Sequence, residues 1–210
     1  MDEYLVPSSF GEAELTDRKS RFIGHIWRTD TEEEALSLIK KMREQYWDAR
    51  HNVYAYIIQG GATRYSDDSE PQGTAGMPIL DVLRREGVFN VTCVVTRYFG
   101  GILLGTGGLV RAYSGAAKLA LDAAGLSMLR LWDQLRLDCP YRFYEQITGE
   151  VARFSGVIED AQFGTEVTLR MLLPQEQTAA FCTRLTDLSG GQLKPEQEGQ
   201  ISRAVPTKSS

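Results

Sequence analysis

The sequence predicts an α+β fold in two parts, and three features of the 210-residue chain support this prediction. The first is the stretch Thr96–Ser114, in which a β-prone run leads into a glycine-rich loop and a helical pattern leaves it. The second is a helix signal at residues 31–46, followed by a β-prone segment. The third, beyond about residue 134, is the order β-α-β-β-α-β, which is the split βαβ arrangement of ferredoxin-like domains.

The composition is that of a soluble globular protein. Hydrophobic residues make up 42% and charged residues 24% of the chain, both ordinary values. No apolar run approaches the ~20 residues that span a bilayer. The start, M-D-E-Y-L-V-P, is acidic and lacks the basic and apolar regions of a signal peptide. We therefore expect a cytoplasmic protein with no membrane partner.

Cysteine, histidine and net charge limit the kinds of site. Cys93, Cys139 and Cys182 are odd in number and far apart, which predicts buried thiols and no disulfide-linked partner. His25 and His51 are the two histidines, so a histidine-rich metal centre is excluded. The net charge of −5 means that any nucleic-acid contact has to use a local basic patch.

The first part of the chain alternates strands and helices. Residues 10–27 predict two strands around a polar turn at Thr16–Ser20. Thr31 and Glu34 have the spacing of a capping box, which predicts the start of an amphipathic helix. The segments expected next are a strand at residues 51–58, a polar loop at Thr63–Ala75 and a helix with Pro78 in its first turn that ends near Glu86.

The glycine-rich stretch is a candidate anion site. A helix that follows a strand and a glycine loop offers unpaired N–H groups and the positive end of its dipole to an anion. The alternative is tight packing only, because the spacing matches neither the P-loop nor the dinucleotide fingerprint. The residues predicted to bind an anion or nucleic acid are Arg97, Gly100, Gly101, Gly105, Thr106, Gly107, Gly108, Arg111 and Lys118.

The polar loop contains three carboxylates, those of Asp67, Asp68 and Glu70, which form a candidate Mg²⁺ site. The alternative is a solvated acidic turn that caps the following helix or pairs with Arg97 and Arg111. His51, Ser66, Asp67, Asp68 and Glu70 are the accessory site residues. Apart from Mg²⁺, no cofactor is expected.

The second part of the chain carries the βαββαβ pattern. Its predicted elements are a strand near residues 135–139, a helix near 147–154, a hairpin of strands at 157–163 and 166–172, a helix at about 175–188 and a short strand near Leu193. The predicted domains are 1–132 and 133–198, followed by a polar, frayed tail at 199–210.

Four motifs resemble the IMPACT/YigZ family: H-N-V-Y-A-Y (51–56), S-D-D-S-E-P-Q-G-T-A-G (66–76), V-V-T-R-Y-F-G-G (94–101) and L-G-T-G-G-L-V-R-A-Y (104–113). The segment K-S-R-F-I (19–23) is similar to the family's N-terminal segment. The resemblance implies a βαβ-type N-terminal domain like those of ribosomal proteins and translation factors. It also implies a C-terminal domain similar to the last domain of elongation factor G.

The resemblance also bears on function. Eukaryotic members of the family regulate translation and carry an additional N-terminal partner-binding domain. The resemblance does not extend to that domain, so we expect a bacterial member without it. The family pattern has glycine where this chain has Ser69. Serine tolerates a positive φ less readily than glycine, so we expect an altered or strained turn there.

Besides a purely structural interaction protein that uses the C-terminal sheet, two functions are consistent with these features. The first is a non-enzymatic, translation-associated module that binds RNA, the ribosome or a translation factor through the glycine loop. The alternative is an enzyme or sensor for a small phosphorylated ligand, with Mg²⁺ at the acidic loop and His51 as an acid or base. We expect a binding protein, because no nucleophile with an adjacent base is evident in the sequence.

Overall fold

The computed structural model describes residues 3–206 and has the α+β fold that the sequence predicts. Apart from short terminal segments, Tyr4–Met128 form one compact unit and Leu129–Arg203 form the other. The division falls inside a strand, a little before the predicted boundary after residue 132. Each unit has its own buried core, so each is described by itself.

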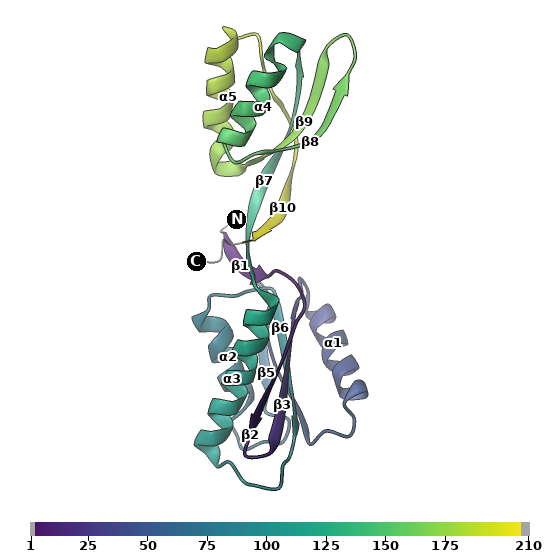
Figure 1. The fold of residues 1–210 in the computed structure, drawn as a ribbon, viewed down its shortest axis with the longest axis vertical. Helices are drawn as coiled ribbons and strands as arrows, with labels where there is room; N and C mark the ends of the chain where they lie inside the picture. Colours follow the sequence, from purple (N-terminus) through teal and green to yellow (C-terminus); the bar gives the residue numbers. More distant parts are fainter. Residues whose placement is uncertain (1–2, 207–210) are drawn as a thin grey trace. The chain divides into compact units, whose positions relative to one another are not determined.

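The N-terminal unit is a sheet with helices on both faces (Figure 1). Its strands pair antiparallel in the order β2-β3-β6-β4-β5. Helices α2 and α3 cover one face over the larger core, and α1 covers the other face. The elements are β1 (Tyr4–Pro7), β2 (Gly11–Asp17), β3 (Ser20–Arg28), α1 (Glu32–Gln45), β4 (His51–Ile57), β5 (Thr63–Ser66), α2 (Gly76–Arg85), β6 (Val91–Tyr98) and α3 (Thr106–Ala124).

Local sequence signals explain several of these boundaries. The Thr31 side chain accepts the N–H of Glu34, as the predicted capping box requires, and the Glu34 carboxylate reaches back to the N–H of Asp30. Gly125 ends α3 with a positive φ of 67°, a conformation that favours glycine. The hairpin at Thr16–Ser20 is formed by β2 and β3 with Asp17 opposite Ser20.

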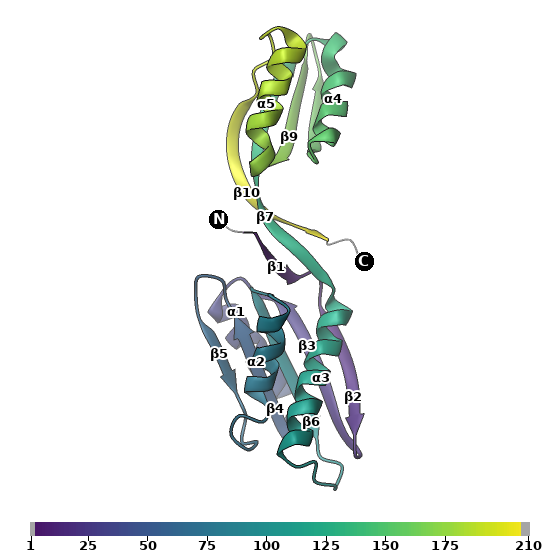
Figure 2. The ribbon, with the colours of Figure 1, turned by 90° about the vertical axis from the view of Figure 1, so that its left-hand side faces the viewer.

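The C-terminal unit has the predicted ferredoxin-like order of elements. In sequence these are β7 (Leu126–Cys139), the short 3₁₀ helix η1 (Tyr141–Phe143), α4 (Tyr144–Arg153), β8 (Val157–Phe163), β9 (Val167–Pro174), α5 (Gln175–Ser189) and β10 (Glu196–Pro206). The strand order is β7-β9-β8, β7 also pairs with β10 and with β1, and β9 is antiparallel to both β7 and β8. Helices α4 and α5 lie on the same side of this sheet (Figure 2).

Two segments differ from the prediction. Thr63–Ser66, expected in a polar loop, forms the short edge strand β5 beside β4. The predicted strand near Leu193 is absent from the described chain, and the predicted frayed end from residue 199 is instead part of β10 as far as Pro206. Two polar side chains of this strand have a buried partner, because Gln197 and Gln200 donate to the carboxylate of Asp133 on β7. Residues 207–210 of the predicted tail lie outside the described residues.

Candidate functional site

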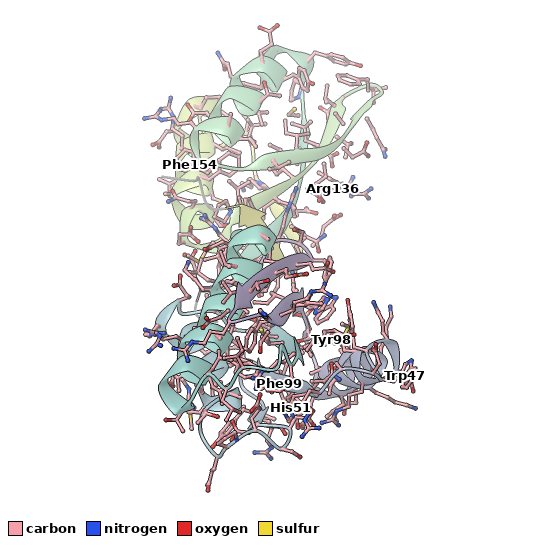
Figure 3. The ribbon with its side chains drawn as sticks, turned by 60° about the horizontal axis from the view of Figure 1, so that its bottom comes forward. Trp47, His51, Tyr98, Phe99, Arg136 and Phe154 are labelled. Carbon is pink, nitrogen blue, oxygen red and sulfur yellow. The ribbon has the colours of Figure 1, made fainter. Side chains whose placement is uncertain are left out.

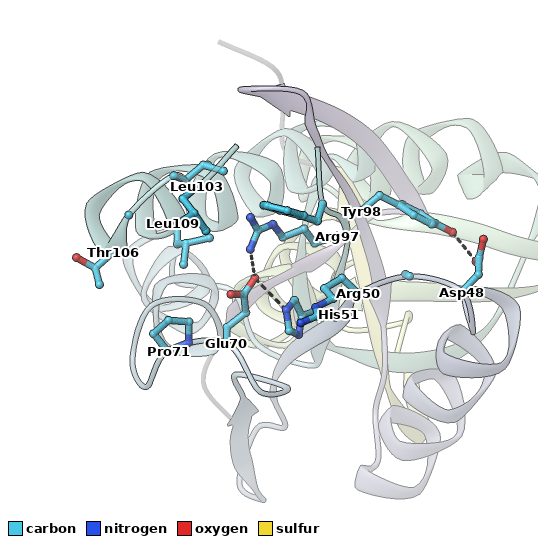
Figure 4. Close-up of a pocket in the computed structure, with 14 residues that line it drawn as sticks. Asp48, Arg50, His51, Glu70, Pro71, Arg97, Tyr98, Leu103, Thr106 and Leu109 are labelled. Carbon is cyan, nitrogen blue, oxygen red and sulfur yellow. Dashed lines mark hydrogen bonds and ion pairs between the residues drawn. The ribbon is translucent and has the colours of Figure 1, made fainter. Parts of the chain in front are cut away.

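A pocket of about 1040 Å³ lies at one end of the N-terminal sheet (Figure 4). It is formed by the end of β6 and the loop after it, the start of α3, the segment that enters β4, and the loop after β5. Figure 3 shows His51 and Phe99 in the same region of this unit. The lining residues are Asp48, Ala49, Arg50, His51, Glu70, Pro71, Arg97, Tyr98, Phe99, Leu103, Leu104, Gly105, Thr106 and Leu109.

The carboxylate of Glu70 is the centre of a buried polar cluster at this pocket. Its Oε1 accepts hydrogen bonds from Nη1 of Arg97 at 2.5 Å and from the hydroxyl of Tyr113 at 2.8 Å. Nε2 of His51 lies 3.7 Å from the same oxygen (Figure 4). Burial, followed by the nearby Glu70 charge, raises the pKa of Tyr113, which keeps its hydroxyl a donor.

Arg97 is buried, with only 5% of its surface exposed, although the sequence predicts a phosphate contact there. Its guanidinium lies over the rings of Phe22 and Phe99, with its central carbon 5.3 and 5.6 Å from their centroids. The carboxylate of Glu70 neutralises the charge of Arg97 inside the protein. Arg97 therefore has a structural role, because it connects the sheet and the loop after β6 to the acidic turn that contains Glu70.

The acidic turn orients His51. Nδ1 of His51 lies 2.7 Å from the main-chain oxygen of Asp68. Asp68 and Ser69 both have positive φ, 45° and 68°, so this turn uses the left-handed region at two residues in succession. The sequence-based expectation of strain at Ser69 matches this geometry, because non-glycine residues adopt such φ values at a cost.

The three carboxylates of the proposed Mg²⁺ site do not converge. Asp67 accepts the N–H groups of Gly73, Ala75 and Gly76, and so caps the start of α2. Asp68 accepts the N–H of Asn52 at 2.7 Å, whereas Glu70 belongs to the buried cluster. Within residues 3–206, no group of three or more His, Cys, Asp or Glu side chains is arranged to hold a metal ion.

The accessory Ser66 is also structural in this arrangement. Its hydroxyl accepts the N–H of Asp68 at 3.1 Å and so supports the same turn. Of the five accessory residues, the structure therefore brings His51 and Glu70 to the pocket and uses the other three in the turn.

The glycines of the loop differ in how strongly the local structure requires glycine. A Cβ on Gly100 would lie 2.0 Å from the main-chain carbon of Lys19, so only glycine fits there. Gly101 and Gly105 have positive φ, and a Cβ on Gly108 would press against Leu104 at 2.9 Å. A Cβ on Gly107, by contrast, would have as its nearest neighbour the end of the flexible Arg111 side chain, 3.7 Å away.

The start of α3 borders the pocket. The helix begins at Thr106 after Gly105, and both residues line the pocket. No side chain caps this end, so the first N–H groups carry the positive end of the helix dipole without a side-chain acceptor. This is the part of the predicted anion site that the structure places at the pocket.

Arg111 and Lys118, which were predicted to belong to this site, lie elsewhere. Both line a smaller groove together with Arg85 and Glu86, at the side of α2 and α3. Lys118 is paired with Asp122 at 2.6 Å and with Glu86 at 3.4 Å. The basic residues that the sequence predicts for one anion site are therefore divided between two surfaces.

Other cations, which the sequence did not single out, surround the loop. Arg18 donates to the main-chain oxygen of Leu103 at 3.2 Å, and Lys19 contacts Gly100 through its backbone. Arg50 lines the pocket directly, and its N–H donates to the main-chain oxygen of Arg97. Arg18, Lys19 and Arg50 are all exposed, and we call them the rim cations. They come from two turns distant in sequence, and although Lys19 begins the K-S-R-F-I segment, no single linear motif contains all three.

The fold and the pocket together define a two-unit α+β protein with a largely apolar pocket that holds a buried polar cluster. Residues 18–121 match the family described as the Impact N-terminal domain, and residues 137–192 match a domain of unknown function (DUF1949). The chain belongs to the IMPACT family, as its motifs predict.

Relatives match over nearly the whole chain. The IMPACT family member YvyE of Bacillus subtilis (strain 168) is 34% identical over 96% of this chain and 94% of its own length. The IMPACT family member YigZ of Escherichia coli (strain K12) is 36% identical over 92% of this chain and 97% of its own. A crystal structure of a hypothetical protein is 35% identical, with a TM-score of 0.61, and covers 95% of this chain and 98% of its own.

Membership of this family fits a translation-related regulatory protein. No helix in the described part of the chain is long and apolar enough to cross a bilayer.

Proposed function

We propose that the N-terminal unit binds RNA at the pocket and its rim, and that this binding underlies a role in translation. The observation that carries the proposal is an exposed aromatic side chain, Phe99, that lines the pocket together with the exposed Arg50, while the exposed Arg18 and Lys19 adjoin the loop that follows Phe99. Unpaired RNA offers phosphates to cations and bases to aromatic rings, so its chemistry complements both features.

The rim cations are the groups suited to phosphate. The net charge of the protein is −5, so attraction to a polyanion has to come from a local concentration of positive charge. Arg18, Lys19 and Arg50 supply it around the loop, and the uncapped start of α3 adds its dipole. The buried Arg97 contributes indirectly, because Glu70 has already matched its charge.

Phe99 is suited to stacking on a base. Its ring is 48% exposed, although Arg97 packs against it. A stacked base contributes roughly 1–3 kcal/mol and needs no particular sequence. Tyr56, another aromatic residue of a family motif, is almost fully buried and belongs to the core. Phe99 is therefore an exposed ring at the pocket that an RNA base could reach.

Binding of single-stranded RNA tests this proposal. The variant Arg18→Gln/Lys19→Gln/Arg50→Gln should bind an RNA oligonucleotide at least about tenfold more weakly, with the salt slope reduced by about 2 because three phosphate contacts are lost. Fluorescence anisotropy at several salt concentrations measures both quantities.

The matched control removes the same charge elsewhere. Lys40, Lys41 and Lys194 are exposed and lie outside the pocket, so their triple glutamine variant should bind RNA with nearly wild-type affinity. Equal affinity in the two triple variants would contradict the rim assignment. Retention of ribosome or translation-factor binding by the rim variant would place that contact on another surface.

A further inference from the structure

We infer that the pocket floor recognises the 2′-hydroxyl of a single unpaired ribonucleotide, so that the site distinguishes RNA from DNA. This inference rests on the proposed RNA binding and adds the chemical feature that is read. It follows from the groups at the site, where His51 and the Arg97-paired carboxylate of Glu70 line the pocket as potential acceptors, here called the floor, and the exposed rim cations lie at or beside it.

His51 supplies the first acceptor. A main-chain carbonyl oxygen can only accept, so the contact of Nδ1 with Asp68 assigns the ring proton to Nδ1. In the uncharged ring, Nε2 is then an acceptor. Nε2 lies 3.7 Å from Oε1 of Glu70, beyond hydrogen-bond distance, so its lone pair remains available to a ligand in the pocket.

Glu70 supplies the second acceptor. Its Oε1 already receives Arg97 and Tyr113. None of the hydrogen bonds formed among the described residues involves its other oxygen, Oε2, although Glu70 lines the pocket. A carboxylate oxygen that has no protein donor can accept a hydrogen bond from a ligand, and such charge-assisted bonds are the strong ones.

The two acceptors select the chemical class of the ligand. Because Glu70 and Arg97 are already paired, these groups offer a phosphate no unmatched cation, whereas a hydroxyl can donate to either acceptor. Ribose carries such a hydroxyl at its 2′ position and deoxyribose does not. A nucleotide bound with its phosphates at the rim and its sugar toward the floor satisfies both halves of the site.

The pocket is large enough for one nucleotide. Pockets for small ligands commonly measure about 300–1,000 Å³, and this one, at about 1040 Å³, lies slightly above that range. Phe99 lines the same pocket, so a base can stack while its sugar reaches His51 and Glu70. An unpaired nucleotide fits better than a duplex, whose bases are already stacked.

The test compares oligonucleotides that differ only at the 2′ position. The wild-type protein should bind oligouridine at least about tenfold more tightly than oligodeoxyuridine of the same length, a typical effect of leaving buried acceptors unpaired. Oligouridine with 2′-O-methyl groups should bind as weakly as the deoxy form, because methylation removes the donor. This comparison needs no variant and therefore does not depend on how a mutant folds.

Two histidine variants assign the preference to a residue. His51→Phe should prefer RNA less strongly than the wild type does, with DNA affinity near that of the wild type, because one of the two acceptors is lost. His25→Phe replaces the histidine that lies outside the pocket and should keep the tenfold ratio. A His51→Phe protein that still prefers RNA tenfold would overturn the assignment of His51 as an acceptor of the 2′-hydroxyl.

The outcomes separate this inference from the proposed function. Equal wild-type affinity for RNA and DNA would overturn recognition of the 2′-hydroxyl, while binding at the rim cations would stand. Failure to bind either oligonucleotide would overturn both. A preference for RNA that is weakened by His51→Phe and abolished by 2′-O-methylation would establish the inference.

Discussion

Replacing Glu70 with alanine is expected to lower the free energy of unfolding by about 3–5 kcal/mol, because the substitution leaves a buried arginine without its partner. Arg97 is 5% exposed, and its Nη1 donates to Glu70 at 2.5 Å. The hydroxyl of Tyr113 would lose its acceptor at the same time. Urea unfolding followed by circular dichroism measures the change.

Two further variants show whether the loss comes from the unpaired charge. Glu159→Ala removes a carboxylate on the exposed strand β8 and should change the stability by less than about 0.5 kcal/mol. Adding Arg97→Met to Glu70→Ala should recover part of the loss, because the buried charge is then absent. A Glu70→Ala protein as stable as the Glu159→Ala protein would contradict the buried cluster.

Alanine substitutions at Gly100 and Gly107 are expected to have opposite effects. Gly100→Ala should lower the free energy of unfolding by about 3 kcal/mol, at the upper end of typical overpacking, since its Cβ would overlap the rigid backbone at Lys19. Gly107→Ala should raise it by roughly 0.5–1 kcal/mol, because the position is helical and the added Cβ meets only the end of a flexible side chain.

The two substitutions also distinguish a role in packing from a role in ligand binding. Both glycines were predicted as anion contacts, but the structure gives Gly100 a packing reason that needs no ligand. Thermal or urea unfolding of the two proteins under one set of conditions measures the difference in sign. Equal destabilisation by both substitutions, or none by either, would contradict the local geometry described for this loop.

Much of the fold follows from local sequence signals. The capping box at Thr31, the hairpin around residues 16–20 and the helix end at Gly125 all depend on residues close together in the chain, and all three are formed as predicted. The βαββαβ order of the C-terminal unit also follows from periodicity alone. Such signals are readable because each element and its cap lie within a few residues.

The structure differs from the prediction where contacts between residues far apart in sequence determine the local structure. β5 and β10 are polar strands with weak periodicity, and they form because β4 and β7 offer pairing edges. Arg97 is a phosphate contact in the sequence interpretation, but Glu70, 27 positions earlier, buries and neutralises it. The rim cations come from turns far from the glycine loop in sequence, so only the folded chain brings them to it.

The central claim, that RNA binds at the pocket of the N-terminal unit, is tested most directly by an NMR titration with a single-stranded RNA oligonucleotide. The account predicts that amide shifts change chiefly at residues 18–20, 50–51 and 97–109, which form the rim, the floor and the start of α3. Changes confined to residues 129–203, with the pocket amides unmoved at saturating RNA, would contradict it.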